Sequence, residues 1–340
     1  MRKRSSSVTI RDVAKEADVS VATVSRYINR SAPVSEEVAE RLKTVMAELR
    51  YVPHAAARNL ATRKTRVIGL LLNNLHNDFF VPLLNGIEAV VRKMGYNLTV
   101  ATYHADIRNE TAPPIGPQNT DGLLVFSDGL TDEDLISLNE TGFPIVLVHR
   151  TPPPSTTIPS VTVENVDITR NLIDHLIRVH GKRRILFLRG PVHQEDSVHR
   201  ENGYRAALEG NGIPFDERLI LNGEFERDIS FDVMNDFLEN GRRVDFDAVF
   251  TGDDDAAIGV LRSLQKFNLN VPQDVAVVGF DDLGFAPFLN PPLTTVRAPT
   301  EEVGRIAAEK LFQLLEDQPI NEVMILPTEI IFRRSCGCMI

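Results

Sequence analysis

The first fifty residues show short apolar patterns of helical period, separated by polar breaks. Thr9 can cap a helix that begins one residue later, and Ser20 can cap a second helix over residues 21–28. Ser35 can cap a third helix over residues 36–49, whose apolar residues recur every three or four positions. The pattern therefore predicts three helices, the second of which follows the first across a tight turn.

From Val67 onward, continuous apolar runs alternate with longer stretches of helical period. Runs of this length are typical of parallel strands that are covered on both faces. The expected strands fall into two series, residues 67–72, 98–100, 122–126 and 145–148, and then residues 185–188, 248–250 and 275–278. Helices are expected near residues 198–210, 227–239 and 255–267. The sequence therefore predicts an α/β body with two lobes of doubly wound parallel sheet.

Charge is distributed unevenly along the chain. The net charge is −10, yet residues 1–66 hold 14 Lys and Arg against 7 Asp and Glu, whereas residues 67–340 hold 23 against 40. A basic head on an acidic body is expected when only the head meets a phosphate backbone. Chance clustering of basic residues is the alternative that charge alone leaves open.

The composition, 43% apolar and 25% charged, is ordinary for a folded globular protein and excludes a mainly disordered chain. No apolar run reaches membrane-spanning length, and the basic start lacks the apolar stretch of a secretory signal. We therefore expect a cytoplasmic protein without a membrane partner.

The two cysteines, Cys336 and Cys338, are too few and too close for a disulfide framework or for a four-ligand zinc site. They favour a reducing compartment. His175 and His180 are expected to be solvated or structural, and the acidic triplet Asp253–Asp255 lacks the spaced oxygen ligands of a cation site. We expect no metal and no cofactor.

The predicted second helix has side chains suited to the major groove of DNA. Val21, Ala22, Thr23 and Ser25 are small or polar, and Arg26 is long enough to reach a base edge. A helical bundle that binds no nucleic acid is the alternative.

The run from Val8 to Asn29 (VTIRDVAKEADVSVATVSRYIN) resembles the head of the lactose repressor (LacI/GalR) family of bacterial regulators. The resemblance continues through Val34–Glu36 and through Tyr51–Leu60 (YVPHAAARNL), which is similar to the hinge of that family. It implies that Val21 and Ala22 set operator preference, that Arg26 reads a base, and that neighbouring hydroxyl and amide groups hold the backbone. The DNA-binding residues expected on this basis are Thr9, Ser20, Val21, Ala22, Thr23, Ser25, Arg26, Asn29, Tyr51, His54, Ala57 and Leu60.

The resemblance gives the hinge a specific role. Ala57 and Leu60 match the pair that enters the minor groove at the operator centre, where an apolar wedge kinks the duplex. Leu60 could instead be an apolar residue on a helix docked against the body. Since a helix this short is marginal in water, residues 54–61 are expected to fold only on operator DNA and in a dimer.

The body resembles the rest of the same family, which shares its fold with periplasmic sugar-binding proteins. The implied division is a head at 1–52, a hinge at 53–66 and a body at 67–340. Lobe 1 is expected at about 67–163 plus 291–320, and lobe 2 at about 164–290 plus 321–340. The run Thr111–Gln118, with three prolines, disrupts the second helix normally found between the strands near 98 and 123.

Polyhydroxylated ligands need bidentate donors and acceptors for their hydroxyls and an aromatic wall for the apolar face of the ring. The effector-binding residues expected from the resemblance are Asn77, Phe79, Asp167, Arg200, Asp253 and Asp281. Asp253 replaces the asparagine usual in the family. The alternative role of Asp253 and Asp281 is to cap a following helix.

These observations predict a sequence-specific transcriptional regulator, a repressor of carbohydrate uptake or metabolism genes. It is expected to bind a pseudo-palindromic operator as a homodimer under control of a small ligand, a sugar or sugar derivative, with a nucleobase or nucleoside as the alternative. The chain lacks the phosphate loop, the dinucleotide fingerprint, the zinc-protease motif and the nucleophile elbow, so no enzyme is predicted. A transport-type sugar-binding protein on the same body fold would need a signal peptide and would have no basic head.

Overall fold

The computed structural model describes residues 8–29, 32–51, 64–75, 78–103, 113–239, 246–318, 320 and 322–339. The chain forms two compact units, Met1–Thr65 and Arg66–Ile340. The expected hinge helix at 54–61, with His54, Ala57 and Leu60, lies outside the described residues, as does Asn77. Within the described part, no helix is long and apolar enough to cross a membrane.

The first unit contains the three predicted helices, α1 (Ile10–Glu16), α2 (Val21–Asn29) and α3 (Glu36–Glu48). Their apolar faces meet in one small core. Its buried residues are Val13, Ala14, Ala17, Val24, Leu42, Val45 and Tyr51. Two of the three expected caps are present, because Thr9 contacts Asp12 and Ser20 accepts a hydrogen bond from the backbone of Thr23. Ser35 precedes α3 but makes no capping hydrogen bond with its side chain.

The first sheet of the body has six strands in the order β11-β5-β4-β3-β1-β2, and all its pairings are parallel. The strands are β1 (Val67–Leu72), β2 (Asn97–Thr102), β3 (Gly122–Phe126), β4 (Ile145–Val148), β5 (Ser160–Val163) and β11 (Val323–Leu326). The central strands β3 and β4 are buried along their whole length, which explains their continuous apolar sequences.

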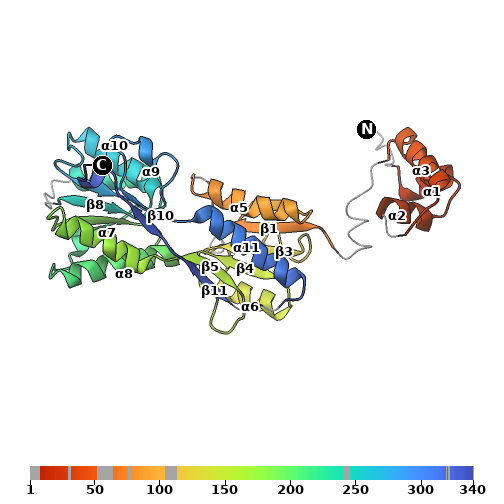
Figure 1. Ribbon diagram of the computed structural model, residues 1–340, viewed down its shortest axis with the longest axis horizontal. Helices are drawn as coiled ribbons and strands as arrows, with labels where there is room; N and C mark the ends of the chain where they lie inside the picture. Colours follow the sequence, from red (N-terminus) through yellow and green to blue (C-terminus); the bar gives the residue numbers. More distant parts are fainter. Residues whose placement is uncertain are drawn as a thin grey trace, which may run out of the picture. The chain divides into compact units, whose positions relative to one another are not determined.

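Three helices belong to this lobe, α5 (Phe80–Lys93), α6 (Asp132–Glu140) and α11 (Thr300–Leu315). Helices α5 and α11 lie side by side in Figure 1 although more than two hundred residues separate them. Glycines permit the close approach: a Cβ on Gly86 would lie 2.0 Å from the carbonyl oxygen of Glu301, and one on Gly304 would lie 2.3 Å from that of Leu83.

The second sheet has four parallel strands in the order β7-β6-β8-β9. They are β6 (Ile185–Arg189), β7 (Ile220–Asn222), β8 (Ala248–Thr251) and β9 (Ala276–Val278). Helices α7 (Val166–Arg178) and α8 (Glu195–Gly210) cover one face, and α9 (Arg227–Glu239) and α10 (Asp254–Lys266) cover the other. Fold class and two-lobed architecture agree with the sequence prediction.

The crossings between the lobes differ from the expected boundaries. Strand β10 (Thr295–Arg297) continues from the second sheet, because Thr294 bridges to Val278, and it pairs antiparallel with β12 (Glu329–Ile331). Strand β11 pairs with β5 of the first sheet. The chain therefore enters lobe 1 after residue 297 rather than at 291, and leaves it after residue 326 rather than at 321.

The proline-rich run forms no helix in its described part, residues 113–118, and the described residues between β2 and β3 form turns. Ile115 is 5% exposed and packs with the apolar side chains on that face of the first sheet. Residues 113–118 are therefore a loop in a part of the chain where the family usually has a helix. Three short 3₁₀ turns, Glu217–Leu219, Ala286–Phe288 and Arg334–Cys336, complete the body.

Candidate functional site

Helix α2 presents the face that the sequence predicts for the major groove. Val21, Ala22 and Arg26 are exposed, while Val24 on the opposite side is fully buried in the core of the head. Ser20 Oγ accepts from the backbone N–H of Thr23 at 3.0 Å, and Asn29 Nδ2 donates to Ser25 Oγ at 3.2 Å. The start of the helix is therefore fixed, and its small residues leave room for a base edge.

Two other expected DNA-binding residues have structural roles in the head. Tyr51 is 9% exposed and belongs to the core of the head, so its contact with DNA stays a prediction. Thr9 donates from its Oγ to the Asp12 carboxylate at 2.7 Å, and its backbone N–H does so at 2.8 Å. These hydrogen bonds lower the pKa of Asp12.

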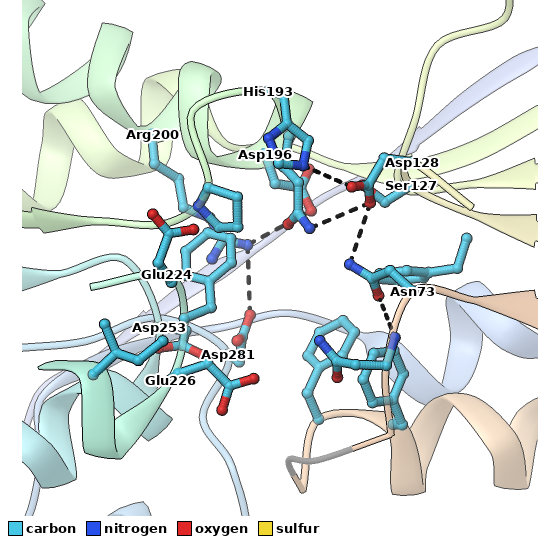
Figure 2. A pocket seen from close by; sticks show the side chains of 18 residues that line it. Asn73, Ser127, Asp128, His193, Asp196, Arg200, Glu224, Glu226, Asp253 and Asp281 are labelled. Carbon is cyan, nitrogen blue, oxygen red and sulfur yellow. Dashed lines mark hydrogen bonds and ion pairs between the residues drawn. The ribbon is translucent and has the colours of Figure 1, made fainter. Parts of the chain in front are cut away.

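The body has a cavity of about 300 Å³ between its lobes, at the carboxyl ends of the strands (Figure 2). Residues that follow β1 and β3 line one side, and residues that follow β6, β7, β8 and β9 line the other. The lining residues are Asn73, Asn74, Phe79, Phe80, Phe126, Ser127, Asp128, Pro191, His193, Gln194, Asp196, Arg200, Glu224, Phe225, Glu226, Ile229, Asp253 and Asp281.

Four of the expected effector-binding residues meet in this cavity: Phe79, Arg200, Asp253 and Asp281. Asp167 does not, because it lies in the first turn of α7, where its 66% exposed side chain pairs with Arg170 at 3.0 Å. Asp167 therefore lies apart from the four residues that meet in the cavity.

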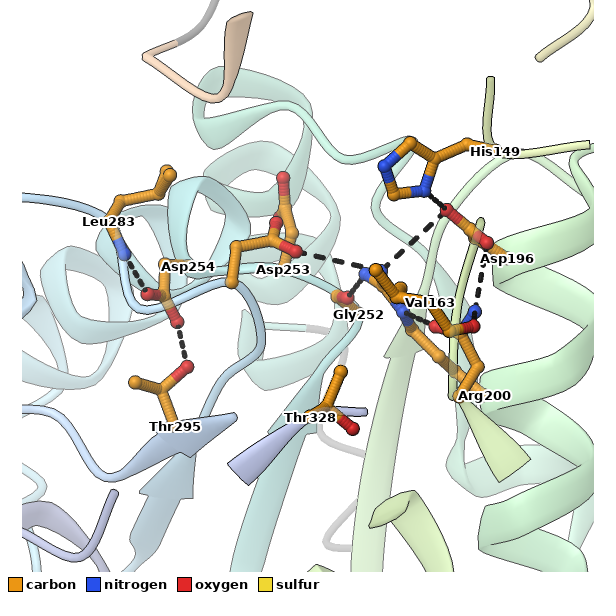
Figure 3. Close-up of polar contacts among 12 residues, drawn as sticks. His149, Val163, Asp196, Arg200, Gly252, Asp253, Asp254, Leu283, Thr295 and Thr328 are labelled. Atoms are coloured by element: carbon orange, nitrogen blue, oxygen red, sulfur yellow. Dashed lines mark hydrogen bonds and ion pairs between the residues drawn. The ribbon is translucent and has the colours of Figure 1, made fainter. Parts of the chain in front are cut away.

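Arg200 is the centre of a buried polar network (Figure 3). It is 3% exposed, donates from Nε to Asn165 Oδ1 at 2.9 Å and from Nη1 to the carbonyl oxygen of Gly252 at 2.5 Å. Its guanidinium lies 3.6 Å from the centre of the Phe280 ring. These contacts fix the orientation of the Arg200 guanidinium. Its Nη2 atom then faces Asp281 at 3.5 Å and Asp196 at 3.9 Å.

The Asp281 carboxylate is buried and only partly satisfied. Its Oδ1 accepts no hydrogen bond from any described residue, although Arg200 lies within ion-pair distance. Burial raises the pKa of Asp281, while Arg200 and His149 act in the opposite direction. An acceptor without a donor at the cavity wall is available to a ligand hydroxyl.

Asp253 both caps a helix and lines the cavity. Its Oδ1 accepts from the backbone N–H of Ala256 at 2.8 Å at the start of α10, and the residue is 3% exposed. Burial raises its pKa well above the ordinary value, and the charge of Asp281 adds to the shift. Asp253 therefore has the capping role that was the alternative, and it also lies where the predicted binding role requires.

The rest of the acidic triplet holds the body together. Asp254 accepts from the backbone N–H of Leu283 at 2.9 Å and from Thr295 Oγ1 at 2.6 Å (Figure 3). Asp255 forms an ion pair with Arg227 at 2.5 Å. Neither residue lines the cavity.

Polar contacts join the lobes beside the cavity. Asp128, after β3, accepts from His193 Nε2 at 2.8 Å and from Gln194 Nε2 at 3.3 Å, both after β6. His149, after β4, lies 2.7 Å from the Asp196 carboxylate. Although burial alone raises the pKa of Asp196, His149, Arg200 and Asn165 together lower it.

Aromatic rings form two walls. Phe79 and Phe126 lie 5.8 Å apart between ring centres on the lobe 1 side. On the lobe 2 side, the Phe225 ring lies against two glycines, since a Cβ on Gly190 would be 2.1 Å from it and one on Gly252 would be 2.6 Å from it. Glu224 and Phe225 both have positive φ, 56° and 57°, a costly conformation for L residues.

Several lining residues were missed from the sequence. Asp196 lies four residues before Arg200 on one helix, a spacing that puts both on the same face and could have indicated it. Asp128, His193 and Phe225 lie in connections after strands, where no periodicity marks them.

The head and the body match two families. Residues 9–54 match the model of bacterial regulatory proteins of the lacI family, and residues 173–336 match that of a periplasmic binding protein-like domain. The ribose operon repressor of Escherichia coli K12 is 32% identical over 96% of this chain and 99% of its own length.

Two solved structures extend the comparison. A lac repressor dimer bound to operator and the anti-inducer ONPF has a TM-score of 0.78 at 26% identity, over 97% of this chain and 99% of the other. The complex of the transcriptional regulator CelR with cellobiose has a TM-score of 0.69 at 30% identity, over 96% and 99%. With its helical DNA-binding head and its two-lobed ligand-binding-protein fold, this chain belongs to the LacI family of bacterial transcriptional regulators, which are not enzymes.

Proposed function

We propose that this protein represses genes of carbohydrate uptake or metabolism and that a neutral, polyhydroxylated ligand in the cavity between the lobes controls its binding to operator DNA. The observation that carries the proposal is the convergence of Phe79, Arg200, Asp253 and Asp281 on one cavity. An aromatic wall opposite bidentate polar groups is the arrangement that suits a sugar ring and its hydroxyls.

The charge of the cavity favours a neutral ligand. Six lining residues are acidic, Asp128, Asp196, Glu224, Glu226, Asp253 and Asp281, whereas Arg200 is the only lysine or arginine among the described lining residues. Because Arg200 Nη2 already faces the carboxylates of Asp281 at 3.5 Å and Asp196 at 3.9 Å, its positive charge is compensated within the protein. A phosphorylated sugar or a uronate would therefore meet repulsion, and a free sugar would not.

The cavity size sets a second limit. A volume of about 300 Å³ is at the small end of ligand pockets, which suits one small molecule. The ligand of the CelR complex, cellobiose, is a neutral sugar, which supports the same ligand class here. A nucleobase or nucleoside remains an outcome of the test.

In this proposal, ligand binding changes DNA binding by changing the relative position of the two lobes. The contacts of Asp128 with His193 and of His149 with Asp196 cross from one lobe to the other next to the cavity. A ligand that binds one relative position of the lobes better than another shifts their equilibrium by that difference in affinity. We propose that a homodimer transmits the shift to two heads on a pseudo-palindromic operator, one per half-site.

A thermal-shift screen of the full chain tests the ligand class. Neutral mono- and disaccharides, sugar phosphates, uronates and nucleosides are compared at equal concentration. Only neutral sugars are expected to raise the melting temperature, because bound ligand stabilises the folded state. Stabilisation by sugar phosphates or nucleosides alone would contradict the proposal that the acidic cavity binds a neutral sugar.

A pair of matched variants locates the site. Asp281→Asn removes a carboxylate from the cavity wall, and Asp167→Asn removes one from the exposed start of α7. The first is expected to weaken binding of the sugar found in the screen by about 10-fold or more, and the second is expected to leave it unchanged. Equal effects would place the ligand elsewhere.

A further inference from the structure

Four side chains that bind metals in proteins meet at one point of lobe 2, away from the cavity. His175 lies in the last turn of α7 and His180 lies shortly after it, while Cys336 and Cys338 lie near the end of the chain. One ligand atom of each residue lies within 4.8 Å of all the others. In the sequence the two cysteines alone are too few for a zinc site, and the two histidines lie more than 150 residues before them.

The distances fit tetrahedral coordination. Zinc bonds of about 2.0–2.1 Å to nitrogen and about 2.3 Å to sulfur require separations of about 3.3 Å between nitrogens and about 3.6 Å between nitrogen and sulfur. The Nε2 atoms of His175 and His180 are 3.1 Å apart. Cys338 Sγ lies 3.4 Å and 3.5 Å from these two atoms, and Cys336 Sγ lies 4.0 Å from His175 Nε2. The remaining pairs of ligand atoms lie within 4.8 Å, so shifts on the order of 1 Å would complete the geometry.

The backbone holds the two sulfurs in place. Gly337, between the cysteines, has φ of +108°, and a Cβ there would lie 3.0 Å from His180 Nδ1. Ser335 donates to the carbonyl oxygen of Val277 at 2.6 Å and accepts from the backbone N–H of Thr294 at 2.8 Å. This turn therefore needs glycine at its centre and is anchored to the second sheet before it reaches the histidines.

The surroundings of the ligand atoms also suit a metal. Cys336 is 1% exposed, and Thr294 Oγ1 lies 3.1 Å from its sulfur. The ring of Phe332 packs 4.4 Å from that of His175 between ring centres. Outer contacts of this kind orient ligands and exclude water.

We propose that His175, His180, Cys336 and Cys338 bind one zinc ion that fastens the C-terminal segment to helix α7. Two imidazoles and two thiolates form a closed set of four ligands, which is typical of a structural zinc site rather than a catalytic one. The ion would anchor the segment that follows β12, a strand that pairs with β10 where the chain passes between the lobes. None of the four residues lines the ligand cavity, so the proposal is independent of the effector.

Metal titration of the full chain tests the site. Protein purified with a reductant and a chelator is dialysed free of chelator and titrated with Zn²⁺ in competition with a chromophoric zinc indicator. One equivalent is expected to bind, and both thiols are then protected from a thiol reagent. Co²⁺ in place of Zn²⁺ is expected to give the intense visible bands of a tetrahedral site and a thiolate-to-metal charge-transfer band.

Variants assign the ligands. Cys338→Ser and His180→Gln are each expected to lower zinc affinity by more than about 100-fold, since loss of a ligand costs at least as much as loss of an outer contact. His199→Gln replaces a partly exposed histidine of α8 and is the matched control with unchanged affinity. Melting in the presence of chelator shows that each variant is folded before titration.

Three results would overturn the proposal: no stoichiometric zinc binding by the reduced wild type, an octahedral Co²⁺ spectrum without the thiolate band, or unchanged affinity in Cys338→Ser. Recovery of Cys336 and Cys338 as a disulfide from protein that binds no zinc would point to a redox role instead and would equally refute it.

Discussion

Loss of the Arg200 side chain should destabilise the body as well as weaken ligand binding. In wild-type protein the guanidinium is 3% exposed, donates to Asn165 and Gly252, and faces two buried carboxylates. Arg200→Ala removes all these contacts at once.

The expected loss of unfolding free energy depends on which carboxylate loses its ion-pair partner. Asp196 keeps His149 and Asn165 as partners, whereas Asp281 loses the only ion-pair partner found for it in the described structure. Breaking a buried ion pair costs about 3–5 kcal/mol, and a single uncompensated charge suggests the lower end, about 3 kcal/mol. At roughly 2–4 °C per kcal/mol, the melting temperature of the body should fall by about 6–12 °C.

The pH dependence has a definite sign. Burial already raises the pKa of Asp281, and loss of Arg200, which acts in the opposite direction, should raise it further. Protonation then removes the uncompensated charge, so the folded variant takes up protons that the unfolded chain does not. Its deficit should be full at alkaline pH and should shrink as the pH falls through the folded-state pKa of Asp281.

Urea unfolding of Arg200→Ala, Asp281→Asn and the double variant measures the coupling of the pair. Arg205→Ala is the control, because Arg205 lies on the same helix, is 44% exposed and pairs with Glu201, a contact worth at most about 1 kcal/mol. The double variant should recover about 1 kcal/mol or more relative to additive behaviour. The proposed network would be refuted if the losses of unfolding free energy in the double variant were additive. It would also be refuted if Arg200→Ala and Arg205→Ala lost the same amount.

Three further predictions concern other parts of the molecule. Arg26→Ala should weaken binding to a selected operator by about 1–3 kcal/mol and leave ligand affinity intact. Arg41→Ala on α3 should instead lower the affinity for all duplexes alike. Anisotropy titrations with specific and random DNA distinguish these two effects. Asp253→Asn keeps an acceptor for Ala256 but carries no charge, so it should stabilise the ligand-free body by about 1 kcal/mol at pH 8. Since a carboxyl with a raised folded-state pKa is destabilising only above its unfolded value, this gain should vanish near pH 4, and a gain that persists there in thermal melts would contradict the assignment. Phe225→Ala removes the ring that fills the slot beside Gly190, so the cavity should accept larger sugars in calorimetry; an unchanged order of affinities would show that Phe225 does not limit the site.

Much of the fold could be predicted because a buried strand or helix face appears in the sequence as a local pattern of apolar residues. Strands β3 and β4 are buried along their whole length and read as continuous apolar runs. Strands β5 and β7 were missed because they have four and three residues and include serine, threonine or asparagine. The lobe boundaries were displaced because β10 and β11 are assigned to a lobe by pairing partners far away in the sequence.

The site was predicted only where the family resemblance or a chemical type pointed to it. Arg200 and Asp281 line the cavity, whereas Asp167 lies outside it and Tyr51 lies in the core of the head, because a matching position in the sequence does not fix the surroundings of a side chain. The metal cluster was missed because 158 residues separate His180 from Cys338, and spacing rules for zinc sites apply to ligands that are close in sequence.

The most direct test of the account measures the coupling between the two sites. Operator selected from a random duplex pool is titrated with and without saturating sugar, and the sugar is titrated with and without saturating operator. The account predicts that each ligand changes the affinity for the other by the same factor, about 5-fold to 150-fold, and that Asp281→Asn shifts the sugar concentration required. Operator affinity that stays the same at every sugar concentration would contradict the claim that the cavity controls the DNA-binding head.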